Sequence, residues 1–460
     1  MCGRFRYKKG EIAKAALVIR YFLITRRIHM ILAKHIKYSL NLIVNDLCQN
    51  PDLHLKKPGI HFTRVRKIPL DQVIKIILSM GGKSINKELL EHYSWKTDVP
   101  SCSAFVQQRN KVNPSFFEEI FRLFTKKMDP QNKYKGYRLI ACDGSDISIA
   151  KNPDDPETFF KDHRHEGFNL LHLNAFYDLC SNLYLDALVQ SRKKVSEYRA
   201  LWQMIDRSDI NGKVIVVADR GFESYNVLAH AQEKGWKILL RAKDINSQGI
   251  VARLHLNNQD EFDQDVLITL GKSQKQELFQ KYENYRCIMK NSTFDYLKDS
   301  KDIYQLPLRI LRFKLNDDSY EAIITTLSRE EFSMDEIKKI YHIRWGIETA
   351  YMHLKYAIGL NHLHSRKKEL ILQEIFAKLT MYNYCEKITR SIVVEESVGN
   401  KHIYQVNISM AFHICLKYYK SEKINIRELI KKYILPIRKD RAYPRKVRRR
   451  SFIHFNYRIS

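Results

Sequence analysis

The chain has 460 residues, of which 44% are hydrophobic and 11% aromatic, so it can bury a large core and is not a disordered polymer. Its 79 Lys and Arg residues exceed its 51 Asp and Glu residues, which gives a formal net charge of +28. This excess indicates a polyanionic partner, and nucleic acid is the first candidate. A basic protein encoded by an AT-rich genome is the alternative explanation of the charge.

The cysteines and the apolar runs indicate the cellular setting of the protein. The eight cysteines are scattered without a CxxC pair, which argues against a zinc ribbon or a disulfide framework and favours a reduced, cytoplasmic setting. The apolar run Ala13–Thr25 contains Lys14 and Arg20 and is too short to span a bilayer. No membrane partner is therefore predicted.

Residues 1–132 are expected to form a mostly helical domain. The segments 73–83 and 113–128 are amphipathic, with apolar residues at helical spacing. Basic residues are frequent here, and the segment 101–112 is compatible with a small DNA-binding module. A plain helical bundle explains the same pattern equally well.

The pattern changes near residue 134 to that of an α/β domain. Buried strands are predicted over 137–149 and 211–222, and the apolar run of each ends at an aspartate, Asp143 and Asp219, that leads into a turn. A mixed sheet with parallel strands, covered on both faces by helices, is therefore expected. Its other predicted parts are a hairpin over 168–190, helices over 196–207 and 225–235, and a strand over 236–243.

A β-rich insertion and a helix follow this domain. Residues 249–327 hold short strand-like runs separated by polar turns, beginning with 251–256. The helix is predicted over 338–358, where two faces recur at helical spacing. One face is apolar, with Ile340, Ile343, Ile347, Leu354 and Ile358, and the other carries Tyr341, Arg344, Glu348, Tyr351 and Lys355. Taken alone, the second face is compatible with a solvated surface bearing an Arg–Glu pair.

Three carboxylates suggest the chemistry. In an open α/β sheet, functional groups gather beyond the carboxyl ends of the strands, where Asp143 and Asp219 are expected. Two carboxylates at one edge repel each other unless a cation lies between them. With Glu348 they form a set of oxygen ligands that suits Mg²⁺ or Mn²⁺, and a pair of such ions promotes in-line displacement at phosphorus.

Simpler interpretations exist for several of these residues. An aspartate at a strand end is often only a helix cap or a turn former. Asp146, three residues after Asp143, is a rival candidate for the first carboxylate. The histidines with loosely ligand-like spacing lack surrounding Cys or carboxylate patterns, so a metal role for them is disfavoured; they are His163, His165, His172, His362 and His364.

The motifs resemble those of a known family. The spacing Tyr341-x₂-Arg344-x₃-Glu348-x₆-Lys355 is similar to the Tyr-Arg-Glu-Lys signature of one branch of bacterial insertion-sequence DDE transposases. The stretches 137–146 and 217–226 resemble the first and second catalytic strands of that branch. The order strand-Asp, strand-Asp, β-rich insertion and helix-Glu is also the same, and the resemblance covers about residues 60–400.

The resemblance implies an RNase H-like core, with a mixed sheet flanked by helices, and a metal-dependent DNA reaction. Asp143, Asp219 and Glu348 would be the catalytic and metal-binding triad, holding two Mg²⁺ ions for which Mn²⁺ substitutes. Tyr341, Arg344 and Lys355 would hold phosphates of the transposon end. Arg344 is accordingly interpreted as a DNA contact rather than as the ion-pair partner of Glu348.

The implied reaction is transposition by cut-and-paste. A homodimer would bind the terminal inverted repeats in double-stranded DNA, cleave each end to free a 3′-OH, and join that hydroxyl to target DNA. It would work in the bacterial cytoplasm, on the nucleoid when bound to DNA. The alternatives are an inactive or domesticated DNA-binding protein derived from a transposase, and an RNase H-like nuclease without strand transfer.

Some members of the branch stack a flipped base on a Trp of the insertion. Residues 249–327 contain no Trp, and Phe262, Phe294 or Tyr296 could replace it.

The pattern and the resemblance together predict five segments along the chain. They are a helical DNA-binding domain over 1–132, the first part of the core over 133–248, the insertion over 249–327, the second part of the core over 328–395 and a basic C-terminal region over 396–460.

The basic tail generates a prediction about salt. Residues 438–450 carry eight Arg and Lys against one Asp, which is typical of contact with phosphates. Removing 438–460 should weaken DNA binding and flatten the dependence of log K on log salt, because fewer counterions are released. Fluorescence anisotropy at several salt concentrations measures both. A full-length variant with the eight basic residues changed to Gln should behave like the truncation, and an unchanged slope in both would show that the tail does not contact DNA.

Overall fold

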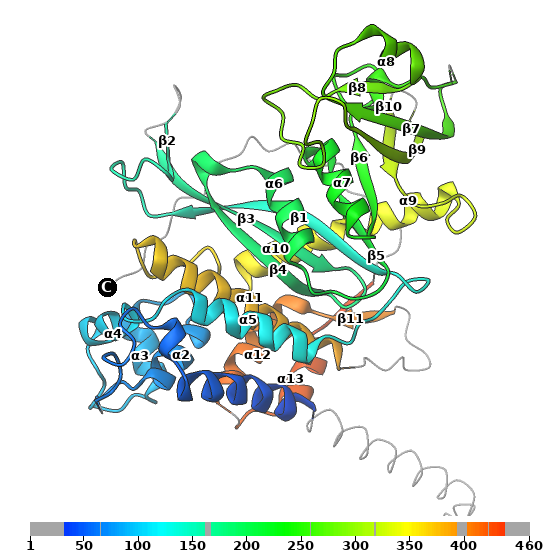
Figure 1. Ribbon diagram of the computed structural model, residues 1–460. Coiled ribbons are helices and arrows are strands. Elements are labelled where there is room, and N and C mark those ends of the chain that lie inside the picture. The colour runs from blue at the N-terminus through cyan, green and yellow to red at the C-terminus, as the bar shows by residue number, and fades with distance from the viewer. Residues whose placement is uncertain are drawn as a thin grey trace, which may run out of the picture. The chain divides into compact units, whose positions relative to one another are not determined.

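The computed structural model describes residues 32–64, 66–161, 167–257, 259–316, 319–392, 403–421 and 423–437. It divides into two compact units (Figure 1). One comprises Asp129–Met352, and the other joins Met1–Met128 to His353–Ser460. The run Ala13–Thr25, His163, His165 and the basic tail lie outside the described residues. The five predicted sequence segments stay a prediction.

The unit formed by the two ends of the chain is mostly helical. A helix over 32–49 precedes α2 (Leu70–Ser79), α3 (Ile85–His92), α4 (Cys102–Arg109) and α5 (Ser115–Met128). The C-terminal part adds α11 (Lys368–Arg390), α12 (Ile408–Lys420) and α13 (Ile426–Lys432), with the short strands β11 (Tyr404–Val406) and β12 (Ile434–Pro436) paired antiparallel. Helix α11 is buried along nearly its whole length, as expected of a helix surrounded by others.

Helix α11 carries a buried charge network. Glu374 accepts a hydrogen bond from Arg109 Nη2 at 2.8 Å and another from His364 at 2.9 Å, and both carboxylate and guanidinium are 1% exposed. Arg109 Nε also donates to the Gln373 side chain at 3.0 Å. Burial alone raises the pKa of Glu374, but Arg109 and His364 outweigh it and bring the pKa down to about 2. Glu374 is therefore ionised in the folded protein.

The other unit is built on a large mixed sheet. Its strands lie in the order β2-β3-β1-β5-β6-β10-β9-β7-β8, and β4 pairs with β3 (Figure 1). Strand β1 (Arg138–Ile149) pairs antiparallel with β3 (Phe168–Asp178), whereas β5 (Val214–Ala218) and β6 (Lys237–Ala242) run parallel to it. An antiparallel hairpin of β3 and β4 (Leu183–Ser191), joined through β1 to parallel strands, is the RNase H-like arrangement, and the predicted fold class is confirmed.

Helices cover both faces of the central strands, as the alternating strand residues require. Leu201 of α6 (Glu197–Arg207) and Val227 of α7 (Tyr225–Glu233) pack in one core with Val216 of β5. Residues of α9 (Met334–Ile343) pack in a second core with Val217, the next residue along the same strand. The strand thus separates two apolar layers.

The predicted insertion extends this sheet. Strand β10 (Ser319–Thr325) pairs antiparallel with β6, and β9 (Ile303–Asn316) and β7 (Phe262–Gly271) continue outward to β8 (Tyr285–Cys287). The expected strand over 251–256 is wrong, because Val251–Arg253 forms one 3₁₀ turn whose buried Val251 anchors it to the core. No helix among the described residues is long and apolar enough to cross a membrane.

Replacing Glu374 with Gln tests the buried network. The variant leaves the Arg109 guanidinium buried without its counter-charge, which should lower the free energy of unfolding by about 3–5 kcal/mol. Glu119→Gln is the control, because its partner Arg122 is 54% exposed and the cost should stay below about 1 kcal/mol. Urea denaturation followed by circular dichroism measures both.

The same variant has an expected pH dependence. The pKa of Glu374 in the folded chain lies below its ordinary value of 4.5, so ionisation of Glu374 stabilises the fold above that pH and this contribution is lost as the pH falls toward 2. The stability difference between the parent and Glu374→Gln should shrink over this window. A difference that is already small at pH 7 would contradict the network's role.

Candidate active site

Two aspartates lie side by side where two parallel strands stop pairing. The ladder between β1 and β5 ends at the pair Cys142–Ala218, so Asp143 and Asp219 come next on neighbouring strands. The turn predicted after Asp143 is wrong, because β1 continues through Gly144 to Ile149 and pairs there with β3. Asp219 does end its strand, and its side chain accepts a hydrogen bond from the Arg220 N–H at 2.8 Å.

The predicted helix over 338–358 is broken at Arg344. Helix α9 begins with a capping box between Ser333 and Glu336 and ends at Ile343, and α10 (Trp345–Tyr356) follows. Because of this break the expected apolar stripe is not continuous, and Ile343 is 43% exposed while Ile347 is fully buried. The face expected to be polar is instead mostly buried: Tyr341, Arg344 and Tyr351 are 7%, 4% and 4% exposed.

Arg344 joins two of the three predicted carboxylates. Its Nη2 donates to Glu348 Oε1 at 2.8 Å, and its Nη1 lies 3.7 Å from Asp143 Oδ2. In the chain without DNA, Arg344 is thus the ion-pair partner of Glu348, contrary to the expectation from the sequence. Its contact with DNA stays a prediction. The pair forms because the helix break directs the guanidinium toward the sheet, where Asp143 adds a second negative charge.

Other side chains orient the two aspartates. The Tyr341 hydroxyl donates to Asp219 Oδ1 at 3.3 Å, and Arg241 Nη1 lies 3.9 Å from the same oxygen. The Tyr351 hydroxyl donates to the backbone carbonyl of Asp143 at 2.9 Å. Tyr341 and Tyr351 thus tie the α9–α10 segment to both strand ends.

The site has an excess of negative charge. Burial raises the pKa of Asp143 to about 6; Arg344 opposes this rise, whereas Glu348 and Glu197 add to it. Carboxylate oxygens are the ligands that Mg²⁺ and Mn²⁺ prefer, so the donor set suits such an ion. Among the described residues no three acidic, His or Cys side chains converge closely enough to hold a metal, and Arg344 pairs with Glu348 and lies 3.7 Å from Asp143.

A second cluster next to the aspartates was missed by sequence reasoning. His172 lies between Asp146 at 2.7 Å and Glu197 at 3.2 Å, and its side chain is 8% exposed. Burial lowers the pKa of His172, but the two carboxylates outweigh it and raise the pKa to about 9. Asp146, the rival of Asp143, is thus paired with a protonated histidine. Cross-strand pairing of Asp146 with His172 is the signal that would have revealed it, and it requires the strand register.

Glu197 approaches the backbone of β1 at Gly144 and of the turn after β5 at Gly221. A Cβ added to Gly144 would lie 2.7 Å from Glu197 Oε1, and one added to Gly221 would lie 2.8 Å from Glu197 Oε2. The carboxylate therefore packs directly against the backbone beside Asp143 and Asp219. Only Gly at both positions lets it approach so closely.

Part of the chain matches a known protein family. The family described as the transposase DDE domain matches residues 134–384, which is more than half of the chain. The chain belongs to this family. No curated protein matches it. Among solved structures, this DDE transposase is similar to the piggyBac transposase in a cryo-EM synaptic complex with hairpin DNA, with 10% identity and a TM-score of 0.43 over 88% of this chain and 81% of that one.

Two further residues were considered from the sequence: Lys355, a predicted DNA contact, and His364, a disfavoured metal ligand. Lys355 is in the last turn of α10, half-buried, and belongs to the other compact unit. His364 has both ring nitrogens engaged, one by Glu374 and one by the Lys83 carbonyl, so neither is available to a metal.

Gly144→Ala tests the packing of Glu197 and His172. The new Cβ would lie 2.3 Å from His172 Nε2, and the ring cannot move aside because carboxylates hold both of its nitrogens. The expected loss is about 1–3 kcal/mol of unfolding free energy, measured by thermal or urea denaturation. Gly346→Ala is the control, since its nearest neighbour is a flexible Leu179 methyl at 3.2 Å and alanine favours the helix by roughly 1 kcal/mol. Equal stability of the two variants would contradict the packing.

Proposed function

We propose that this DDE transposase binds the terminal inverted repeats of its insertion sequence as a homodimer and catalyses cleavage and strand transfer at the Asp143–Asp219–Glu348 site. The observation that supports this most directly is that three carboxylates from separate segments lie around the Arg344 guanidinium. Asp143 and Asp219 are adjacent on paired strands, and Arg344 links Glu348 to Asp143. The reaction would take place on the nucleoid DNA of a bacterial cell.

Asp143, Asp219 and Glu348 are the residues that would hold the divalent metal, Mg²⁺ with Mn²⁺ as a substitute and two ions for each site. When bound, such ions activate the attacking oxygen and stabilise charge on the leaving oxygen at phosphorus. Tyr341 and Tyr351 keep the two strand ends and the helix together by their hydrogen bonds. Cleavage and strand transfer use the same groups, because each is an in-line displacement at phosphorus by an oxygen nucleophile.

Arg344 would exchange partners when DNA binds. Its guanidinium is paired with Glu348 in the free chain, and its buried Nε has no hydrogen-bond partner among the described residues. A backbone phosphate accepts the planar fork of an arginine in the same way as a carboxylate does. Transfer of Arg344 to a phosphate, with Tyr341 and Lys355 as further contacts, would release Glu348 to the metal. The DNA end would thus complete the metal site.

Glu348→Gln tests the assignment of the triad. The variant keeps the size of the side chain but loses the charged ligand, so nicking of DNA that carries the element's ends should fall at least about 100-fold. Binding of that DNA should be largely retained, because Glu348 carries no positive charge. Gel assays with labelled ends and Mg²⁺ measure both quantities.

Glu330→Gln is the matched control, because this carboxylate is exposed and should leave nicking unchanged. Unchanged nicking by Glu348→Gln would overturn the triad. Nicked products that are never joined to target DNA would favour a nuclease without strand transfer. Binding by the parent protein without any metal-dependent cleavage would favour an inactive DNA-binding protein.

A further inference from the structure

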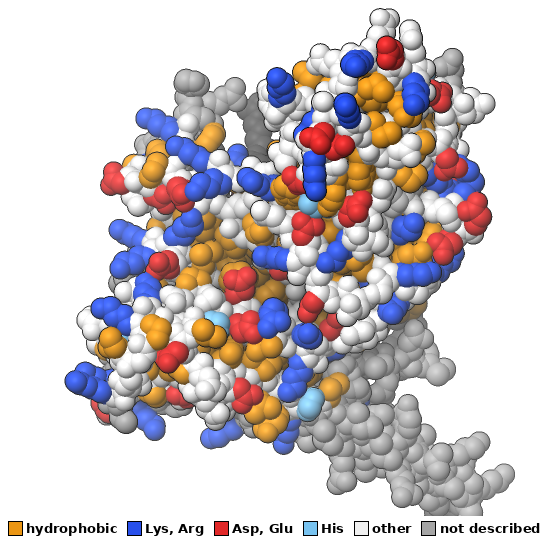
Figure 2. All heavy atoms as spheres, viewed as in Figure 1, with side chains coloured by type: hydrophobic (Ala, Val, Ile, Leu, Met, Phe, Trp, Pro, Cys, Tyr) orange, Lys and Arg blue, Asp and Glu red, His pale blue; other side chains and the backbone are white. Residues whose placement is uncertain are grey.

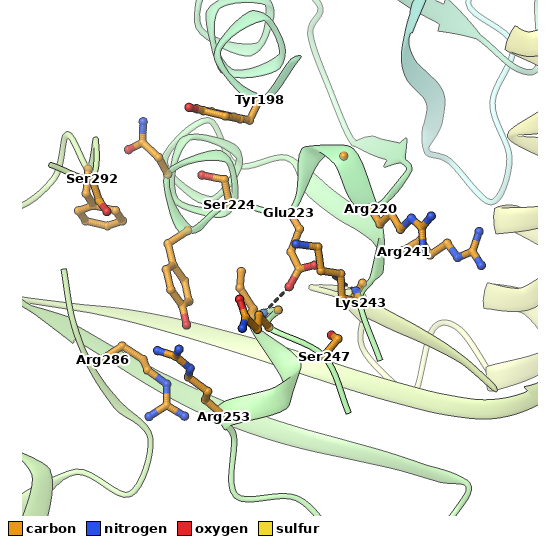
Figure 3. Close-up of a pocket in the computed structure, with 18 of the residues that line it drawn as sticks. Tyr198, Arg220, Glu223, Ser224, Arg241, Lys243, Ser247, Arg253, Arg286 and Ser292 are labelled. Atoms are coloured by element: carbon orange, nitrogen blue, oxygen red, sulfur yellow. Dashed lines mark hydrogen bonds between the residues drawn. The ribbon is translucent and has the colours of Figure 1, made fainter. Parts of the chain in front are cut away.

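A large cavity opens beside Asp219 within the unit that holds the mixed sheet. Its volume is about 1280 Å³, and it extends from the end of β5 to the segment after β8 (Figure 3). This exceeds the roughly 300–1,000 Å³ of a site for one small molecule, so it has room for an extended ligand. Five cationic side chains line it: Arg220, Arg241, Lys243, Arg253 and Arg286.

Most carboxylates of the cavity are already engaged by other groups. Glu321 pairs with Arg241 at 3.2 Å. Asp244 accepts two hydrogen bonds from Arg312, at 2.8 and 3.1 Å. Glu223 accepts from the backbone N–H of Lys243 at 3.0 Å and from that of Ile250.

The remaining cations are left without counter-charges. Lys243, Arg253 and Arg286 make no ion pair with any residue in the described ranges. On the face shown in Figure 2, Lys and Arg elsewhere are interspersed with Asp and Glu rather than gathered in one patch. Because Arg241 pairs with Glu321 and Arg312 with Asp244, the other four cations of the lining are opposed only by Asp219 and Glu223. The lining therefore has a net positive charge, which favours an anionic ligand.

The strongest evidence lies at the end of the cavity away from Asp219. Figure 3 shows Arg253 and Arg286 together there, with Arg220 and Arg241 at the other end. Arg286 Nη1 donates to the Tyr285 carbonyl at 2.8 Å, while its Nε and Nη2 are buried and find at most a weak hydrogen bond, to the Tyr225 hydroxyl. Buried donors of this kind are costly unless a ligand or water satisfies them.

The Tyr225 hydroxyl adds a further polar group at this end. Burial raises the pKa of Tyr225, while the nearby Arg286 and Arg253 lower it, which places both guanidinium groups close to the phenol. Two guanidinium groups and a hydroxyl close together are a set of donors for the oxygens of a phosphate.

We propose that Arg253, Arg286 and Tyr225 form a phosphate subsite for the backbone of a single-stranded nucleic-acid segment that extends from Asp219. The proposal rests on the proposed function, which brings a phosphodiester to Asp219. A single strand is favoured over a duplex because the cavity combines unpaired cations with the aromatic side chains of Tyr225 and of Tyr198, which is 48% exposed. The cations would follow the backbone, and the rings would stack on bases.

The test measures binding of a short fluorescent single-stranded oligonucleotide to the full chain in EDTA, so that no cleavage is needed. Arg286→Ala and Arg253→Ala should each weaken binding about tenfold and reduce the salt slope by about 0.7, the value for one phosphate contact on a single strand. Lys301→Ala removes one exposed positive charge outside the cavity and should change neither quantity.

Thermal unfolding separates a ligand site from a structural role. Arg286 makes no ion pair with any described residue and has two buried donors that are poorly satisfied, so Arg286→Ala should change the melting temperature little, whereas loss of a structural contact would lower it clearly. Unchanged affinity and slope in both arginine variants would overturn the subsite. An equal loss for duplex DNA of the same length, or full competition by inorganic phosphate at low millimolar concentration, would overturn its assignment to a single strand.

The binding result is independent of the catalytic assignment. If the parent binds the oligonucleotide through Arg286 yet does not nick DNA with Mg²⁺, the proposed function fails and the phosphate subsite stands. If nicking depends on Glu348 but binding of the strand does not depend on Arg286 or Arg253, the subsite fails and the proposed function stands.

Discussion

The buried guanidinium of Arg344 is the interaction on which the site depends. It lies 2.8 Å from Glu348 and 3.7 Å from Asp143, in a place where burial and neighbouring carboxylates make negative charge costly. Without a cation there, the helix that carries Glu348 could not approach the strand ends. Arg344 thus holds the helix that carries Glu348 close to Asp143.

The residues around the site also balance buried charges. His172, protonated between Asp146 and Glu197, offsets one of the two negative charges of these carboxylates beside Asp143. Gly144 and Gly221 allow Glu197 to reach the backbone of both strands. On the other side of Asp219, the cavity lined by Arg253 and Arg286 holds positive charge that the described residues do not neutralise. Negative charge is thus concentrated at the strand ends and positive charge along the neighbouring cavity.

Sequence reasoning located the strands and helices that bear the site, because their signals are local. The apolar run before Asp219 and the turn between β3 and β4 each depend on neighbouring residues, and each has the expected structure. It was wrong about the helix over 338–358, where the break at Arg344 reverses the exposure of Ile343 and buries Tyr341. No periodicity predicts such a break, since the contacts that stabilise it come from Asp143 and Asp219, more than one hundred residues earlier.

The sequence by itself determined the RNase H-like order of elements and the candidate carboxylates. Hydrophobic periodicity, turn residues and motif spacing depend only on residues that are close together in the sequence. Which charges face one another was decided only by the tertiary structure. The pairing of Arg344 with Glu348, of His172 with Asp146 and Glu197, and the poorly satisfied donors of Arg286 all depend on strand register and on the path of segments distant in the chain. Electrostatic energies depend on distance and burial, and neither quantity can be calculated before the chain is folded.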